Sequence, residues 1–262
     1  MDLGLFGIIL VIFSALLPSI FYVLWVRNAE ICRREPLALV FLVLFFGATG
    51  AFGAAFIIES SLVFLIFENE TLLNKFLWSL FQPSPEISLF IIAVLLAPVV
   101  EESVKAGGVF LSYKRIIEFE DGLVYGAAIG LGFAATENIV YFSDALQTGF
   151  NVFLVTAIMR TLTSTILHAS STAVSGYGIC KWKLFRQIGQ HSGWLKYLVV
   201  GIILHGSFNF FAIMGLLFSS GMEAYFIGLL LCFILATVAF RIMRLKIREL
   251  DAAYGCKPHR ET

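Results

Sequence analysis

The sequence predicts an all-α, polytopic membrane protein: a bundle of about seven transmembrane helices. Of its 262 residues, 59% are hydrophobic and only 14% are charged, whereas a soluble domain is about half apolar and about a quarter charged. Apolar runs follow one another along the chain, each near the ~20 residues that cross a bilayer. Most basic residues outside these runs follow every second run, which places them on one side of the membrane. Together these observations indicate helices that cross a lipid bilayer.

Hydropathy divides the chain into seven spans. The first lacks the basic residues that open a signal peptide, so we expect it to be retained. The second is long enough to tilt or break near its glycines, "GATGAFGAAF". The four cysteines stand singly, so we expect neither a disulfide framework nor a thiolate zinc site. The predicted spans are Leu3–Val26, Leu37–Phe67, Ile87–Tyr113, Leu123–Ser143, Asn151–Ile179, Tyr197–Phe218 and Tyr225–Met243.

The basic residues predict the orientation. Those outside the spans follow spans one, three, five and seven, and Lys75 is the exception. Because cytoplasmic loops are rich in Lys and Arg, we expect the N-terminus outside and the C-terminus in the cytoplasm. We treat residues 1–262 as a single integral membrane domain with a basic cytoplasmic tail at 244–262.

Ionisable or strongly polar side chains interrupt five of the spans, and Glu59 is the one in the second span. A charge at a helix centre costs roughly 2.5–3.5 kcal/mol, so such residues usually face the bundle interior and have a function. At about 1.5 Å per residue, those on different spans lie within about one and a half turns of one another in depth. We expect Glu59, nearer the outer side, to stay apart from them. The other interrupting residues are Glu101, Glu102 and Lys105, Glu137 and Asn138, Arg160 and His168, and His205 and Asn209.

Helical spacing predicts that these side chains share faces. Glu101 and Lys105 are four residues apart, as are His205 and Asn209, and such pairs are neighbours on a helix. In the fifth span, one predicted stripe contains Arg160, Ser164, His168 and Thr172. We expect the polar faces to line one wet cavity.

Two chemistries suit this set of residues. Adjacent Glu101 and Glu102 cannot both ionise cheaply in a desolvated site, so one can act as a general base toward water, and Glu101 is our first choice. His205 and Asn209 would then donate hydrogen bonds to an oxyanion. Alternatively, Zn²⁺ acidifies a bound water. The ligands predicted for it come from Glu102 or its neighbour Glu101, with Glu137, His168 and His205.

Both of these chemistries would hydrolyse a bond inside the bilayer, but other interpretations of the buried residues compete with hydrolysis. We interpret Lys105 and Arg160 as charge-balancing residues. In a purely structural interpretation, Glu101 and Glu102 would only form a buried ion pair with Lys105 or Arg160 that fixes the packing of the helices. Buried Glu, Lys and His also build proton-coupled transporters, although we find no inverted repeat of broken helices. A scaffold or receptor would not need a pair of glutamates at this depth. The chain also lacks HExxH, GxSxG and GxGD motifs, which argues against other intramembrane protease classes.

Four short motifs occur in order on four successive spans. They are Glu101-Glu102-Ser-Val-Lys105, Phe133-Ala-Ala-Thr-Glu137 followed by Asn138, His168-Ala-Ser-Ser-Thr172 and His205-Gly-Ser-Phe-Asn209. Together they resemble the motifs of the PrsW family of intramembrane proteases, which shares a superfamily with CAAX prenyl endopeptidases and bacteriocin-processing enzymes. The resemblance implies cleavage of membrane-anchored proteins, such as anti-sigma factors, in a prokaryotic cell membrane, with no nucleic-acid partner. It implies as catalytic residues Glu101, Glu102, Glu137, His168, His205 and Asn209, and we take about 88–218 as the catalytic core.

Overall fold

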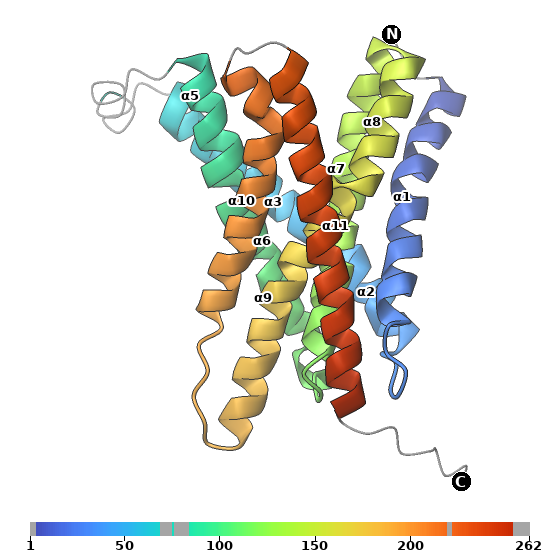
Figure 1. Ribbon diagram of the computed structural model, residues 1–262, viewed down its shortest axis with the longest axis vertical. Helices are drawn as coiled ribbons and strands as arrows, with labels where there is room; N and C mark the ends of the chain where they lie inside the picture. The colour runs from blue at the N-terminus through green and yellow to red at the C-terminus, as the bar shows by residue number, and fades with distance from the viewer. Residues whose placement is uncertain (1–3, 69–74, 76–83, 219–221, 254–262) are drawn as a thin grey trace.

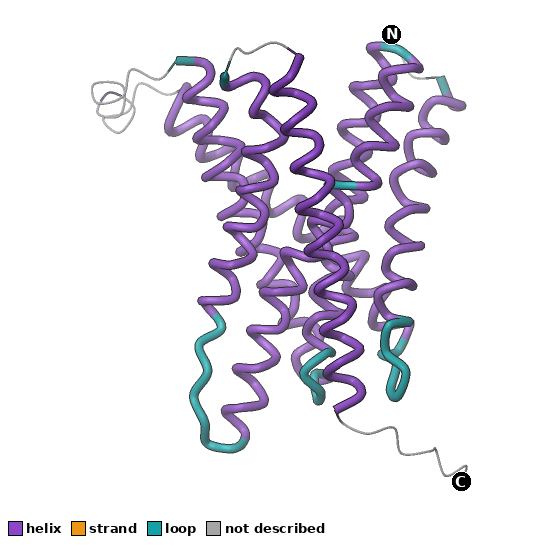
Figure 2. Tube along the Cα trace, viewed as in Figure 1, coloured by secondary structure: helices purple, strands orange, loops and turns teal. Residues whose placement is uncertain are grey.

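A computed structural model describes residues 4–68, 75, 84–218 and 222–253 (Figure 1). Over these residues the chain forms helices and no strand (Figure 2), and seven helical segments are long and apolar enough to cross a membrane. The predicted fold class is therefore confirmed. The helices are α1 (Leu5–Arg27), α2 (Leu37–Phe46), α3 (Phe52–Val63), α5 (Pro85–Phe90), α6 (Ala97–Val109), α7 (Asp121–Thr148), α8 (Phe150–Leu162), α9 (Ser164–Gln187), α10 (Leu195–Leu217) and α11 (Met222–Ala253).

The second and third spans contain π-helical turns. The second span does not break at its glycines, because η1 (Gly47–Ala51) joins α2 to α3 as a π-helical turn, and η2 (Phe64–Glu68) follows α3. In the third span, η3 (Ile91–Leu96) joins α5 to α6, and the 3₁₀ turn η4 (Phe110–Arg115) ends it. Such turns shift the helical hydrogen-bond pattern and are frequent at functional sites.

The fifth span is broken, contrary to the single continuous stripe predicted for it. Thr163, with φ −126° and ψ −76°, separates α8 from α9. Its hydroxyl donates to the Met159 carbonyl at 2.7 Å, and hydroxyl side chains are known to compete with the helical pattern in this way. Arg160 therefore lies on α8, whereas His168 and Thr172 lie on α9.

Helix α7 is the centre of the bundle. In its apolar stretch 78% of residues are buried, against 22–33% in the other spans. A Cβ on Gly126 or Gly130 would collide with the backbone of α9 at Thr172 or His168. Small residues let membrane helices approach closely in this way, and the approach brings the His168 backbone against α7.

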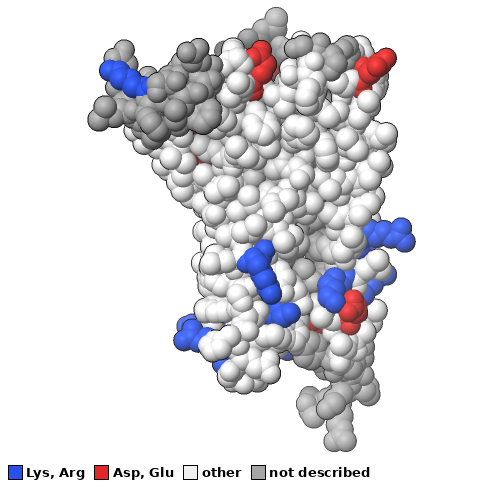
Figure 3. Space-filling view, turned by 60° about the vertical axis from the view of Figure 1, so that its left-hand side comes forward, with Lys and Arg blue, Asp and Glu red and all other residues white. Residues whose placement is uncertain are grey.

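The charged surface residues lie toward the two ends of the bundle. Figure 3 shows a broad uncharged belt, with Lys and Arg gathered over the lower half. Large apolar side chains such as Phe13, Phe56 and Phe226 are exposed, as expected for helices that face lipid. Helix α1 begins at the upper end in Figure 1 and α11 ends at the lower end.

The loop between α1 and α2 is attached to the last turn of α11. The Asp251 carboxylate accepts hydrogen bonds from the main-chain N–H groups of Ile31, Cys32 and Arg33. Cys32 is disulfide-bonded, so the expectation of no disulfide is wrong for this cysteine, because spacing along the chain does not show which cysteines meet in the fold. Cys180 and Cys232 are free.

Buried acidic residues that the sequence did not single out lie in this loop and just before α7. Glu30 and Glu35 lie between α1 and α2, and Glu120 precedes α7; all three are buried. Burial raises the pKa of Glu30 to about 9 and the pKa values of Glu35 and Glu120 to about 8. Neighbouring carboxylates add to this rise for all three groups.

Candidate active site

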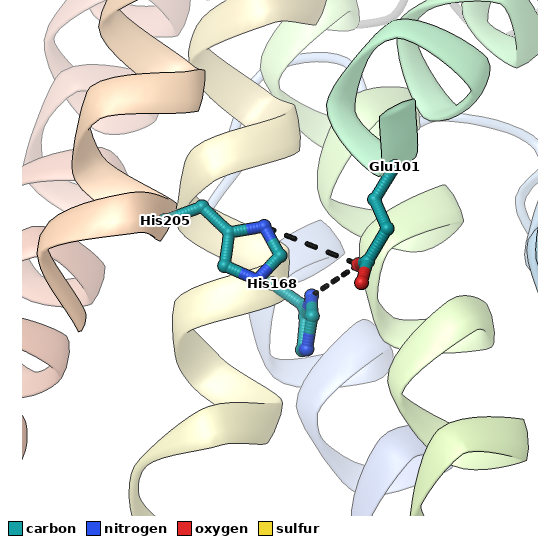
Figure 4. A group of neighbouring side chains, drawn as sticks. All are labelled: Glu101, His168 and His205. Carbon is teal, nitrogen blue, oxygen red and sulfur yellow. Dashed lines mark ion pairs between the residues drawn. The ribbon is translucent and has the colours of Figure 1, made fainter. Parts of the chain in front are cut away.

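Three predicted site residues from three helices meet within the bundle. Glu101 on α6, His168 on α9 and His205 on α10 are all buried, and each offers a ligand atom within 4.8 Å of the other two. The Glu101 Oε2 atom lies 3.9 Å from His168 Nδ1 and 4.0 Å from His205 Nδ1 (Figure 4). The imidazole rings pack edge to face, with centroids 4.7 Å apart.

Glu102 is fully buried and surrounded by donors. Its Oε1 atom lies 3.0 Å from His205 Nδ1, so Nδ1–H donates to the carboxylate and Nε2 is the ring nitrogen left for another partner. The other donors are Lys105 Nζ at 3.1 Å, Ser171 Oγ at 3.0 Å and Thr172 Oγ1 at 3.0 Å. Glu102 thus fixes the orientation of His205 and has little accepting capacity left.

His168 lies between Lys105 and Glu137. Its Nδ1 is 2.9 Å from Lys105 Nζ, and its Nε2 is 2.8 Å from Glu137 Oε2. Since the ammonium can only donate, Nδ1 accepts and Nε2–H donates to the carboxylate. Glu137 therefore orients His168 as Glu102 orients His205.

Two basic side chains balance the carboxylates. Lys105, with no exposed surface, also donates to Glu101 Oε2 at 2.8 Å, and its ammonium lies 3.8 Å from the centre of the Phe133 ring. Arg160 forms an ion pair with Glu137 at 2.8 Å and donates to Asn138 Oδ1 at 2.7 Å. The break at Thr163 does not prevent this contact, because Arg160 reaches α7 directly from α8.

A cavity of about 410 Å³ reaches part of this cluster. Glu101, Glu137 and His168 line it, together with Arg160 and apolar side chains, whereas Glu102 and His205 do not. The volume falls in the range of ligand pockets, ~300–1,000 Å³. Of the two adjacent glutamates, Glu101 is therefore the one that can meet a water or a substrate from the cavity.

Glu59 lines the same cavity, so the expectation that it stays apart is wrong. That expectation used only the depth of each residue in the membrane, whereas the cavity extends over several helical turns and is lined by side chains at different depths. The Oε1 atom of Glu59 is buried and has no hydrogen-bond partner among the described residues.

Asn209 also lines the cavity, but its amide is engaged elsewhere. Its Nδ2 donates to the Ala93 carbonyl in η3 at 2.8 Å. This contact holds α10 to the π-helical turn before α6, as amides commonly do between membrane helices. Ser171, which holds Glu102, was not predicted, although it lies one helical turn after His168.

The group that fits a metal ion is narrower than the predicted ligand set and consists of Glu101, His168 and His205. Glu102 and Glu137, the other carboxylates predicted as ligands, each contact a histidine. Two imidazoles and one carboxylate are a common donor set for catalytic zinc. Carboxylates behind the ligand histidines are equally typical. The donor chemistry therefore fits Zn²⁺, although Lys105 already donates to His168 Nδ1.

Comparisons with known proteins agree on one family. A model described as PrsW family intramembrane metalloprotease matches residues 35–239. The chain is 33% identical to Protease PrsW of Clostridioides difficile (strain 630) over 205 residues, which cover 75% of this chain and 76% of that protein. It is 32% identical to Protease PrsW of Geobacillus kaustophilus (strain HTA426) over 56% of this chain and 59% of that protein. It is 34% identical to Protease PrsW of Bacillus subtilis (strain 168) over 46% of this chain and 54% of that protein. No solved structure matches significantly.

Proposed function

The chain belongs to the PrsW family of intramembrane proteases, and from this premise we propose that its Glu/His cluster hydrolyses peptide bonds of membrane-anchored proteins. One observation carries the assignment: Glu101 is buried between two oriented histidines and still lines a cavity. We take the membrane to be that of a prokaryotic cell, and the substrate to be a single-span protein of the anti-sigma-factor type. The family match favours this function over proton-coupled transport.

Within this proposal, the residues of the cluster divide into two roles. Glu101 faces the cavity and contacts the reacting groups, while Glu102 and Glu137 hold His205 and His168 in fixed orientations. Lys105 and Arg160 offset the negative charge that would otherwise make the buried carboxylates costly. The catalytic core is the segment at about 88–218, because it includes every one of these side chains.

We favour a metal-dependent version, in which Glu101, His168 and His205 hold Zn²⁺. When bound there, zinc would lower the pKa of a water and polarise the peptide carbonyl. Glu137 is then the remaining carboxylate of the cluster that reaches the cavity, so besides orienting His168 it is the candidate to accept a proton from the water and deliver it to the leaving amine. The family description as a metalloprotease supports this version.

A glutamate-only version uses the same residues differently. Glu101 would take the proton from water and return it to the leaving amine. His205 would donate to the oxyanion from Nε2 only as the imidazolium, because the neutral ring already donates its Nδ1–H to Glu102. Asn209 would join it only if its amide left the Ala93 carbonyl.

The test uses the full chain reconstituted with a tagged single-span substrate. Glu101→Gln keeps the shape of the side chain but removes the basic carboxylate, so we expect cleavage to fall by at least ~10²-fold. Glu249→Gln, which changes an exposed glutamate on α11, is the matched control and should cleave normally. Full activity of the Glu101→Gln protein would rule out the proposed site.

A chelator separates the two versions. In the metal version, removal of the ion stops cleavage and added Zn²⁺ restores it, and active protein contains about one metal per chain in this site. In the glutamate-only version, chelation leaves the rate unchanged. Metal analysis of wild-type and His205→Ala protein gives a second readout that does not depend on activity.

The orientation is also part of the proposal. From the basic residues we infer that the lower end of Figure 1 faces the cytoplasm, including the tail that begins at residue 244. Reporter fusions after Thr148 and Phe218 should then read as external, and one after Gln187 as cytoplasmic. Residues 254–262 of the tail lie outside the described part of the chain.

A further inference from the structure

A second group of carboxylates converges at the end of the bundle where α1 joins α2. Glu30 and Glu35 come from that loop, and Asp121 is the first residue of α7. Their exposed fractions are 0%, 4% and 1%. One oxygen from each lies within 4.8 Å of the other two.

Each of these carboxylates is held by one oxygen. Glu30 Oε2 accepts the Glu35 N–H at 2.9 Å, and Tyr125 donates its hydroxyl to Glu35 Oε2. Asp121 Oδ2 accepts the main-chain N–H groups of Ile117 and Glu118 at 2.6 and 3.0 Å. These contacts fix the directions of the side chains without using all of their accepting capacity.

Several oxygens in this region have no partner. Glu30 Oε1 and Asp121 Oδ1 are buried without a hydrogen bond among the described residues, and so are both carboxylate oxygens of Glu120. A buried acceptor that remains unpaired is costly, and a charged one more so. Native structures therefore usually supply a water, a proton or an ion at such positions.

The nearby basic side chains bind other groups. Arg27 and Arg34 donate to the main-chain carbonyls of Glu35 and Glu30 at 2.6 and 3.2 Å, not to their carboxylates. Arg33 lies 3.6 Å from Glu118. The N-terminus of α7 favours a negative charge at Asp121, but it does not account for two glutamates from another loop.

We propose that Glu30, Glu35 and Asp121 bind a hard divalent cation, such as Ca²⁺, Mg²⁺ or Mn²⁺, in a second metal site separate from the Glu101 cluster. An all-carboxylate set suits these ions better than zinc. Oxygens at about 2.3–2.6 Å from a shared Ca²⁺ lie at most about 5 Å apart, which the observed spacing satisfies. Glu120 offers a further carboxylate next to Asp121.

The cation joins two segments that are distant in the sequence. It ties the α1–α2 loop, already held by Asp251 of α11, to the first turn of α7. Helix α7 carries Glu137 and packs against α9, so the site fixes the end of the central helix.

The test is a Mn²⁺ titration of full-length protein in detergent after EDTA treatment, followed by electron paramagnetic resonance. All samples carry Glu101→Gln, so that an ion at the Glu101 cluster contributes little. We expect about one tightly bound Mn²⁺ per chain. Adding Glu35→Gln and Asp121→Asn should weaken binding by at least ~10-fold, while adding Glu249→Gln, at the same end of the bundle, should not change it.

A second measurement does not depend on folding of the double variant. Tb³⁺ binds hard oxygen sites, and bound next to the Tyr125 ring it should give tyrosine-sensitised emission that Ca²⁺ displaces and Tyr125→Phe strongly reduces. Absence of Mn²⁺ binding, equal binding by the double variant, or Tb³⁺ emission unaffected by Tyr125→Phe would each overturn the proposal.

Discussion

The bundle buries two groups of acidic side chains and neutralises them differently. Within the spans, Glu101 and Glu102 contact Lys105, and Glu137 contacts Arg160. At the α1–α2 loop, no described ion pair reaches Glu30, Glu35 or Asp121, whose partners are main-chain N–H groups and Tyr125.

The difference teaches where a membrane protein must carry its own counter-charges. A carboxylate deep in a bundle cannot draw a cation from bulk water at low cost, so the chain provides the cation on a neighbouring helix turn. A cluster at the end of the bundle is within reach of dissolved ions, and there the chain leaves several oxygens without a partner.

The largest loss of stability is expected when the lysine that neutralises two buried glutamates is removed. Lys105→Met leaves Glu101 and Glu102 without their shared cation, and loss of one partner of a buried ion pair costs about 3–5 kcal/mol. We expect the free energy of unfolding to fall by about that amount, measured by denaturant titration in detergent. Unchanged stability would show that the two carboxylates do not depend on Lys105.

A smaller loss is expected at Arg160, because its side chain is 17% exposed and that of Glu137 is 20% exposed. Arg160→Met should lower the free energy of unfolding by about 1–3 kcal/mol, the range for a buried charged group that loses its partner. Cleavage should fall as well, because Glu137 would no longer be held against His168. Arg160→Lys, which retains the charge, is the control and should recover part of both losses.

The smallest effect, with the opposite sign, is expected in the acidic loop. In metal-free protein, Glu35→Gln removes one of several repelling carboxylates but keeps an oxygen for the Tyr125 hydroxyl. We expect the free energy of unfolding to rise by up to about 1 kcal/mol. If the free energy of unfolding fell as much as in Lys105→Met, the carboxylates of both clusters would be neutralised by the protein's own side chains, and the comparison would fail.

Much of the fold could be predicted because apolar length dominates it. The seven spans follow from hydropathy, but Thr163 could not be identified as a break, since an average over apolar residues does not report a backbone dihedral. The π-helical turn at Ile91–Leu96 was likewise not predicted, and with it the Asn209 contact to Ala93.

The sequence predicted which residues form the candidate site better than it predicted which way their side chains point. The i, i+4 spacing placed Glu101 beside Lys105 correctly. It could not reveal that Glu102 faces His205 while Glu101 faces the cavity, because adjacent residues on a helix point about 100° apart and only tertiary packing decides which points where. Glu30 and Glu35 lie outside the apolar runs, so nothing in the sequence distinguished them from solvated loop acids.

The close contact of α7 with α9 determines how the sequence can vary during evolution. Gly130 touches no substrate in the proposed mechanism, yet any side chain there would push against the His168 carbonyl and move the imidazole with it. Gly107 on α6 has open space around its Cβ position and accepts such a change. A library of random variants selected for cleavage should therefore retain glycine at position 130 as strictly as glutamate at position 101, while position 107 drifts.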